Sequence, residues 1–127
     1  MKFLYIILFF IIFIISSSFY YTYSGKNLIT NSKAKYLINN NKIDYIIDVR
    51  TKFEWNLGHY KNKNVKVINI PINNINYLNI TKNIPNNNSY IIVYCNTGQR
   101  ARLAVDKLNK LGYNNVYYIS STYKFLY

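Results

Sequence analysis

One segment, IIVYCNTGQRA at residues 91–101, joins a short apolar run to a polar loop and the start of a helix. Residues 91–94 are too few and too β-branched for a helix, so they predict a buried strand. The only cysteine of the chain, Cys95, follows directly, and Arg100 opens the next element. A sulfur at the carboxyl end of a strand, facing a helix N-terminus, meets unpaired N–H groups and a positive dipole end, which favour thiolate over thiol.

The polar loop after the strand is also a candidate anion site. Backbone N–H groups at a helix N-terminus form a cup for an anion. A lone cysteine is more often a small buried apolar residue, but the strand-loop-helix context favours a reactive one. We therefore expect Cys95 to be a nucleophile and the substrate to be held by the residues that follow it: Asn96, Thr97, Gly98, Gln99, Arg100 and Ala101.

The remaining chain alternates between strand and helix patterns. Apolar residues recur at helical spacing from Ala101 to Leu111, and Gly112 stands where a helix-ending glycine belongs. We also expect a small helix capped by Asn31 or Ser32 and running to about residue 38, a short helix capped by Thr51, and a short helix or turn at 72–78. Further strands are predicted at 43–49, 65–70 and 116–119. This alternation predicts an α/β domain with a mainly parallel central sheet flanked by helices.

Five motifs in this order resemble the rhodanese-like family of sulfurtransferases, over roughly residues 30 to 123. They are Asp48-Val49-Arg50 after a strand, Glu54-Trp55 followed by Gly58-His59, Asn69-Ile70-Pro71, the loop from Cys95 to Arg100, and Gly112-Tyr113 leading to Val116-Tyr117. The resemblance implies a rhodanese-like domain. It also implies that Cys95 attacks a sulfane sulfur, holds it as a persulfide and passes it to a thiophilic acceptor.

The resemblance also suggests the partners, which are a small anionic sulfur donor such as thiosulfate and an acceptor such as cyanide or a thiol. Ligands of such sheets bind at the carboxyl ends of the strands, where Asp48, Arg50 and Cys95 converge. Arg100 is expected either to bind the anionic donor or to hold the loop. For Arg50 we favour a salt bridge with Glu54 over assistance with substrate charge, and we expect Asp48 to fix loops through backbone hydrogen bonds rather than to act as a base.

Two aromatic residues near these motifs are given structural roles. His59 is the only histidine, and a Cys–His pair is a known way to activate a thiol, yet the family's Gly-His is largely structural. Trp55 is expected to pack in the core.

Loop length separates two chemistries. Four residues stand between Cys95 and Arg100, as in sulfurtransferases, whereas related phosphatases place five residues there to cup a phosphoryl group. Two alternatives remain open: a non-enzymatic binding or regulatory module that keeps the fold, and, disfavoured by loop length, a cysteine phosphatase or arsenate reductase.

Three departures from the family pattern affect the surroundings of the site. The segment at 60–66 is longer than the usual turn after Gly-His, and the chain ends at Tyr127, before a usual last helix. Ser121-Thr122 replaces a Gly-Gly pair. If those positions need a positive φ, serine and threonine there are strained.

The N-terminus predicts a membrane segment. Residues 3–15 are entirely apolar, Lys2 precedes them, and tyrosines follow near residue 23. We favour an uncleaved single-pass anchor, with a cleaved signal peptide, and hence a secreted or periplasmic protein, as the alternative. The expected division is an anchor or signal peptide at 1–24, a linker at 25–30 and the rhodanese-like domain at 31–127. The lysines that follow the span favour an orientation with the domain in the cytoplasm.

Charge and cysteine content narrow the function further. The 127 residues carry a formal net charge of +12, but the lysines are scattered, and the abundance of Asn, Ile, Lys and Tyr matches A/T-rich codons. We therefore expect no nucleic-acid partner, although the charge steers anions toward the protein. One cysteine excludes an intramolecular disulfide and a Cys-based zinc site, and we expect no cofactor or metal.

Overall fold

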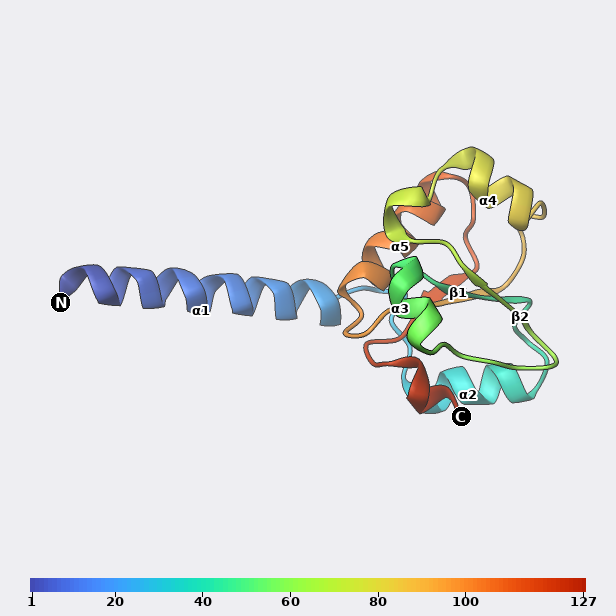
Figure 1. Ribbon diagram of the computed structural model, residues 1–127, viewed down its shortest axis with the longest axis horizontal. Coiled ribbons are helices and arrows are strands. Elements are labelled where there is room, and N and C mark those ends of the chain that lie inside the picture. Colours follow the sequence, from blue (N-terminus) through green and yellow to red (C-terminus); the bar gives the residue numbers. More distant parts are fainter.

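A computed structural model describes all residues, 1–127. Helix α1, Lys2–Tyr23, projects away from a compact α/β body that holds the rest of the chain (Figure 1). By length and composition, α1 is apolar enough to cross a membrane, and none of its apolar window is buried inside the protein.

The body is built on a four-stranded parallel sheet in the order β2-β1-β3-β4. Its strands are β1 (Tyr45–Asp48), β2 (Lys66–Asn69), β3 (Ile91–Tyr94) and β4 (Val116–Tyr118). The predicted parallel α/β fold is therefore confirmed. Three of the strands are shorter at their ends than the apolar runs suggested.

Four short helices and two 3-10 turns surround the sheet. They are α2 (Asn31–Asn39), α3 (Lys52–Leu57), η1 (Ile72–Asn74), α4 (Tyr77–Asn83), α5 (Gln99–Lys110) and η2 (Tyr123–Leu126). Thr51 caps α3 as predicted. The α2 cap is Thr30, one residue earlier than expected, because its hydroxyl accepts the Lys33 N–H. The segment at 72–78 is split between η1 and the start of α4.

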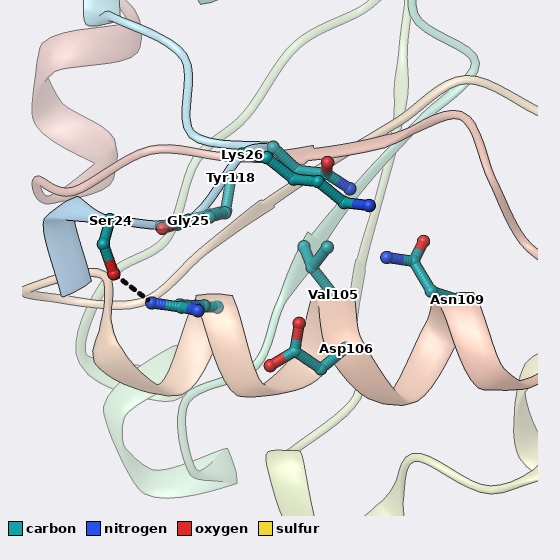
Figure 2. A pocket seen from close by; sticks show the side chains of 9 residues that line it. Ser24, Gly25, Lys26, Val105, Asp106, Asn109 and Tyr118 are labelled. Carbon is teal, nitrogen blue, oxygen red and sulfur yellow. Dashed lines mark hydrogen bonds between the residues drawn. The ribbon is translucent and has the colours of Figure 1, made fainter. Parts of the chain in front are cut away.

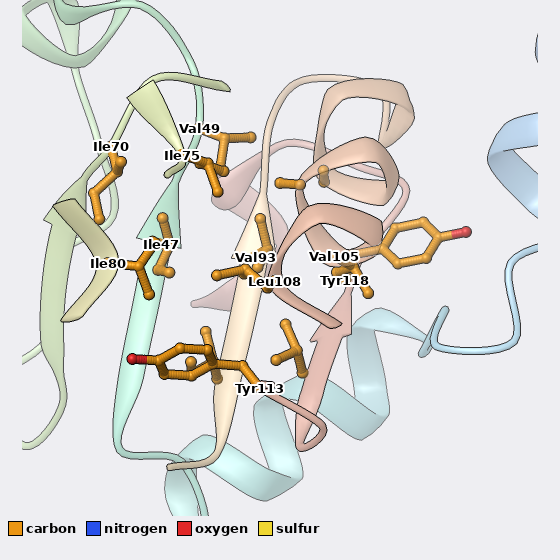
Figure 3. Close-up of a cluster of buried hydrophobic side chains, with 14 of the residues drawn as sticks. Ile47, Val49, Ile70, Ile75, Ile80, Val93, Val105, Leu108, Tyr113 and Tyr118 are labelled. Atoms are coloured by element: carbon orange, nitrogen blue, oxygen red, sulfur yellow. The ribbon is translucent and has the colours of Figure 1, made fainter. Parts of the chain in front are cut away.

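Alternate strand residues divide the apolar core between the two faces of the sheet. Ile47 and Val93 face the larger cluster, which α4 and α5 cover (Figure 3). Ile46 and Ile92 face the smaller cluster, which α2 and η2 cover. Both faces are thus buried, as parallel sheets require, and the edge at the strand ends is left for a site.

Ser121 and Thr122 are free of the backbone strain considered above. Asn41 is the only residue other than glycine with a positive φ. Thr122 has a φ of −69° and caps η2, and the Ser121 hydroxyl donates to Asn31 Oδ1 at 2.6 Å. Serine and threonine in place of glycine therefore cause no strain here, because neither position requires a left-handed backbone.

Candidate active site

The polar residues singled out from the sequence gather at one edge of the sheet. Asp48, Asn69 and Tyr94 end three neighbouring strands, and the strand register places Asp48 beside both of the others. Cys95 follows Tyr94 and is 1% exposed. The Asn69 amide donates to the carbonyls of Asp48 and Arg50, at 3.0 Å each. The chain after β1 is therefore held against the end of β2.

The loop after β3 turns its backbone toward the sulfur. The Gly98 N–H donates to Cys95 Sγ at 3.1 Å, just before α5 begins. Gly98 has a φ of +91°, and a Cβ there would lie 2.7 Å from Ser120 Cα. Only glycine meets both conditions, so this residue lets the loop close around the thiol.

Glu54 connects α3 with the loop and α5. Its carboxylate accepts two hydrogen bonds from Arg100, at 2.7 and 3.1 Å, and one from the Asn96 amide at 2.9 Å. The same carboxylate closes a capping box with Thr51. Of the two roles considered for Arg100, this geometry supports holding the loop.

The charges of this pair are strongly stabilised. The hydrogen bonds from Arg100, together with contacts with Thr51, outweigh the effect of burial and lower the pKa of Glu54 to about 2. The pKa of Arg100 is raised, chiefly by the hydrogen bonds to Glu54, and Cys95 is among the groups that act on it electrostatically. The Arg100 guanidinium therefore remains charged beside the cysteine loop.

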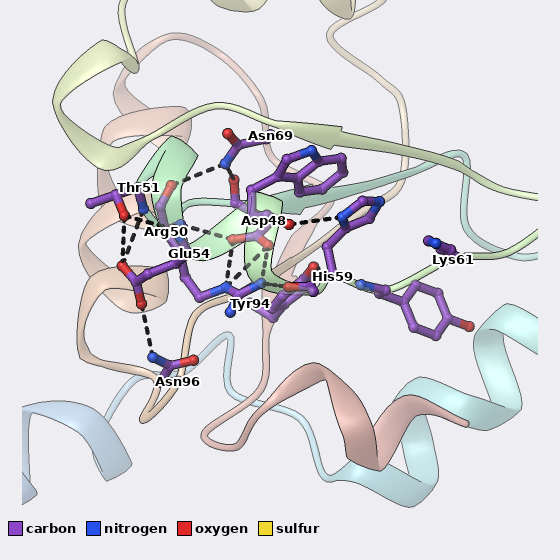
Figure 4. A network of polar contacts seen from close by, with 12 residues as sticks. Asp48, Arg50, Thr51, Glu54, His59, Lys61, Asn69, Tyr94 and Asn96 are labelled. Atoms are coloured by element: carbon purple, nitrogen blue, oxygen red, sulfur yellow. Dashed lines mark hydrogen bonds and ion pairs between the residues drawn. The ribbon is translucent and has the colours of Figure 1, made fainter.

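Arg50 pairs with Asp48, and the expected salt bridge with Glu54 is wrong. The guanidinium donates to both Asp48 oxygens, the closest contact being 2.7 Å, and to the Gly58 carbonyl, also at 2.7 Å (Figure 4). Asp48 also accepts the Arg50 backbone N–H at 2.9 Å. The arginine side chain folds back over the end of β1, because the buried Asp48 offers it two oxygens there, while Arg100 occupies Glu54.

Two tyrosines that the sequence analysis did not single out enclose Arg50. The rings of Tyr94 and Tyr123 lie with their centroids 5.6 and 5.1 Å from the guanidinium carbon. The Tyr94 hydroxyl accepts the Tyr60 N–H at 3.1 Å, and burial raises the pKa of Tyr94 well above its usual value. The sequence signal that could have identified Tyr94 is its position directly before Cys95 at the end of a strand, where successive side chains point to opposite faces.

His59 and Trp55 stack on each other at the side of this network. Their ring centroids are 3.5 Å apart, and His59 Nδ1 lies 3.0 Å from the Trp55 carbonyl oxygen. The expectation that Trp55 packs in the core is wrong: the indole is half-buried, because α3 lies at the rim of the body and its partner is the imidazole.

A pocket of about 380 Å³ opens beside the cysteine loop. Its walls include Arg50, Glu54, Asn96, Tyr123 and Lys124. The acidic, histidine and cysteine side chains of the chain form no cluster of three or more that could hold a metal ion. The site therefore consists of a buried thiol, a fixed loop and two ion pairs.

Comparison with known proteins identifies the domain. The family model of the rhodanese-like domain matches residues 30–124. A search of curated protein sequences finds no match.

Solved structures share the fold at low sequence identity. A rhodanese from E. coli, solved with anions, is 28% identical with a TM-score of 0.55, over 65% of this chain and 89% of that chain. A human single-domain sulfurtransferase is 17% identical with a TM-score of 0.62, over 80% and 95%. A homodimeric polysulfide-sulfur transferase from Wolinella succinogenes is 21% identical with a TM-score of 0.64, over 87% and 78%.

Proposed function

The chain belongs to the rhodanese-like domain family, and on that premise we propose that it is a sulfurtransferase that carries the transferred sulfur as a persulfide on Cys95. The observation that supports this proposal most directly is the hydrogen bond of 3.1 Å from the Gly98 N–H to Cys95 Sγ, at the junction of β3 and α5. An N–H group held in that position stabilises negative charge on the sulfur both before and after the sulfur is transferred.

Loading would proceed by displacement at sulfur. The Cys95 thiolate attacks the outer sulfur of thiosulfate, forming a new S–S bond as the sulfur–sulfur bond of the donor breaks. Sulfite leaves with the electron pair of that bond, and Cys95 remains as a persulfide. A thiolate is the attacking species in such exchanges, and no external oxidant or reductant is consumed.

The anionic donor would reach the loop through the pocket beside Asn96. Lys124 lies at its wall, whereas Arg50 and Arg100 are already paired with carboxylates. We infer that Lys124 and the loop N–H groups attract the donor, and that the two arginines hold the walls of the site. His59 then has a structural role, through Trp55.

Loop size favours sulfur over phosphoryl chemistry. Four residues separate Cys95 from Arg100, and Gly98 lies against Ser120 and Thr22. The loop therefore cannot widen outward at Gly98 without displacing these neighbours. We propose that the cradle accommodates a single sulfur atom and gives no phosphatase activity.

Mass spectrometry of the intact protein tests the assignment. After exposure to thiosulfate, the full-length chain should gain one sulfur atom, which added thiol or cyanide removes. Because Cys95 is the only cysteine, any persulfide is formed at that residue, and Cys95→Ser should gain none. A folded wild-type protein that gains no sulfur would contradict the proposal and favour a non-enzymatic binding module.

A further inference from the structure

The end of α1 is fixed against the body close to the cysteine loop. The Tyr118 hydroxyl donates to the Thr22 carbonyl at 2.7 Å, and Thr22 is 6% exposed. Arg102, on α5, donates to the Tyr21 carbonyl and, at 2.9 Å, to the Ser24 hydroxyl. Figure 2 shows the hydrogen bond between Ser24 and α5, with Gly25 and Tyr118 nearby. These contacts set the position of α1 relative to the site.

A groove of about 420 Å³ lies between α1 and the loop. On the α1 side it is lined by Ile14, Ile15, Ser18 and Phe19, and on the other side by polar residues of the loop, including Asn96, Thr97 and Gln99. Phe19 stacks on Tyr23 along the same face, with ring centroids 4.5 Å apart. The groove is thus apolar along the helix and polar where it meets the loop.

The helix that forms the apolar wall determines what can fill the groove. If α1 crosses a membrane, as its length and composition allow, the apolar end of the groove is continuous with the lipid chains, and its polar end is lined by Asn96, the residue that follows Cys95. A ligand that satisfies both ends is an amphiphile with a hydrocarbon tail and a compact polar head. A small anion such as thiosulfate has no tail to place along Ile14, Ile15 and Phe19.

We propose that this groove binds the tail of a membrane-partitioned alkyl thiol, which is the sulfur acceptor of the enzyme. The inference rests on the sulfurtransferase function proposed above and on α1 remaining in the mature protein. It names the acceptor class for the same cysteine.

The transfer step needs only the two sulfur groups. The acceptor thiolate attacks the outer sulfur of the Cys95 persulfide, and the bond between that sulfur and Cys95 Sγ breaks. Cys95 leaves as a thiolate, and the alkyl thiol becomes an alkyl persulfide, whose outer sulfur takes a proton from water. The N–H of Gly98 stabilises the negative charge restored on Cys95 Sγ.

The two openings would separate donor from acceptor. Asn96 lines both the groove and the pocket that contains Lys124, so the loop lies between a polar entrance and an apolar one. A water-soluble anion then loads the cysteine from one side, and a lipid-soluble thiol unloads it from the other.

Methanethiosulfonate reagents test access along the groove without requiring sulfur transfer. These reagents attach their alkyl thio group to the only cysteine and release methanesulfinate. The full-length protein would be placed in phosphatidylcholine nanodiscs, and the rates of Cys95 modification by decyl and methyl reagents would be measured by mass spectrometry. The ratio of the two rates reports how well the groove guides a hydrocarbon chain to the sulfur.

Adjacent serines of α1 provide a matched pair of variants. Ser18 lines the groove, whereas Ser17 is exposed and lines none of the described pockets. Ser18→Trp should fill the groove and lower the decyl-to-methyl ratio by roughly tenfold, which corresponds to about 1.4 kcal/mol. Ser17→Trp adds the same bulk elsewhere on the helix and should leave the ratio unchanged.

A second pair removes bulk from the helix. Phe19→Ala deletes part of the groove wall and should lower the ratio by about threefold, because a hydrocarbon chain loses contacts there. Phe13→Ala, outside the groove, should not. Equal ratios in the wild type and all four variants would overturn the proposal.

Thiosulfate loading in the same nanodiscs separates the two proposals. A protein that shows the groove effect but never gains sulfur would refute the sulfurtransferase function and leave the alkyl-chain site in place. If thiosulfate loads Cys95 normally and Ser18→Trp does not affect sulfur transfer to an alkyl thiol, the sulfurtransferase function stands and the proposed role of the groove is refuted.

Discussion

Glu54 links three segments of the site. Its two oxygens accept hydrogen bonds from Arg100, Asn96 and Thr51, which belong to three different segments. A single carboxylate therefore joins the start of α3, the cysteine loop and the start of α5. The geometry of the thiol depends on a charge that lies 41 residues earlier in the chain.

The Glu54 pair should make stability depend on pH. Because its pKa is lowered from 4.5 to about 2 in the folded protein, its contribution is complete above pH 4.5 and is lost as the pH falls toward 2. Glu54→Gln should destabilise the protein at neutral pH by about 1 kcal/mol, as expected for a partly exposed pair. Thermal unfolding of both proteins in detergent should show this difference shrinking between pH 4.5 and pH 2; a constant difference would exclude the ion pair as its cause.

The Asp48–Arg50 pair is enclosed far more tightly, and its disruption should cost more. Asp48→Asn would leave Arg50, which is 6% exposed, without its counter-charge, which typically costs about 3–5 kcal/mol. Asp44 is a suitable control, since it is exposed and accepts only the Tyr90 N–H at 2.8 Å among side-chain contacts. Asp44→Asn should cost about 1 kcal/mol or less, and equal losses in the two variants would contradict the assigned burial effect.

At the scale of elements, the cysteine loop is defined by the two structures it connects. β3 is buried along its whole length, and α5 buries Ala101, Ala104, Val105 and Leu108 against the sheet. Both ends of the loop are therefore fixed, and its four intervening residues leave little freedom. Gly98 resolves the remaining constraint with its positive φ and close approach to Ser120.

Lengthening the loop tests whether its size selects the chemistry. One glycine inserted between Gly98 and Gln99 should move the Gly98 N–H away from the sulfur and enlarge the cradle. A displacement of about 1 Å can reduce a rate about a hundredfold, so thiosulfate-dependent sulfur transfer should fall by that order. Hydrolysis of a phosphate ester should be absent in the wild type, and the inserted protein should be tested for its appearance.

Two outcomes would contradict this view of the loop. Equal sulfur transfer in the inserted and wild-type proteins would show that loop size does not select the chemistry. Robust phosphatase activity of the wild type would overturn the proposed function itself.

At the scale of the whole molecule, the N-terminal helix and the site lie on the same side of the body. The strands end at the edge from which α1 departs (Figure 1), and Gly98 lies against Thr22. A membrane around α1 would thus face the cysteine loop and not the opposite edge of the sheet. The proposed alkyl-thiol acceptor follows from this arrangement.

The membrane anchor itself can be tested by fractionation. Since residues 3–15 carry no charge and α1 is long enough to span a bilayer, the full-length protein should remain in the membrane fraction after washing with alkaline carbonate. A peripheral protein of similar charge should be released by the same treatment and serves as the control. A soluble mature form beginning near Ser18 or Gly25 would instead identify a cleaved signal peptide and would remove the groove.

Local patterns were sufficient for the fold and for the cysteine loop. Short β-branched runs specify the strands, apolar residues at helical spacing specify α5, and Gly112 specifies where α5 ends. These features depend only on residues close together in the sequence. Order of motifs then identified the family, and the apolar run at the N-terminus predicted α1. Spacing alone placed Cys95 after the strand and Arg100 at the start of the helix that follows it.

The partners of the charged and aromatic residues were decided only by the tertiary structure. Glu54 lies four residues from Arg50 but pairs with Arg100, 46 residues away, because the neighbouring ends of β1 and β3 bring the segments that follow them together, while Arg50 turns back to Asp48. Trp55 likewise lies at the rim, and Tyr118 and Arg102 hold the end of α1 beside the loop. Sequence spacing determines which residues a strand or turn presents, whereas contacts between distant segments depend on how the strand ends are brought together in the sheet.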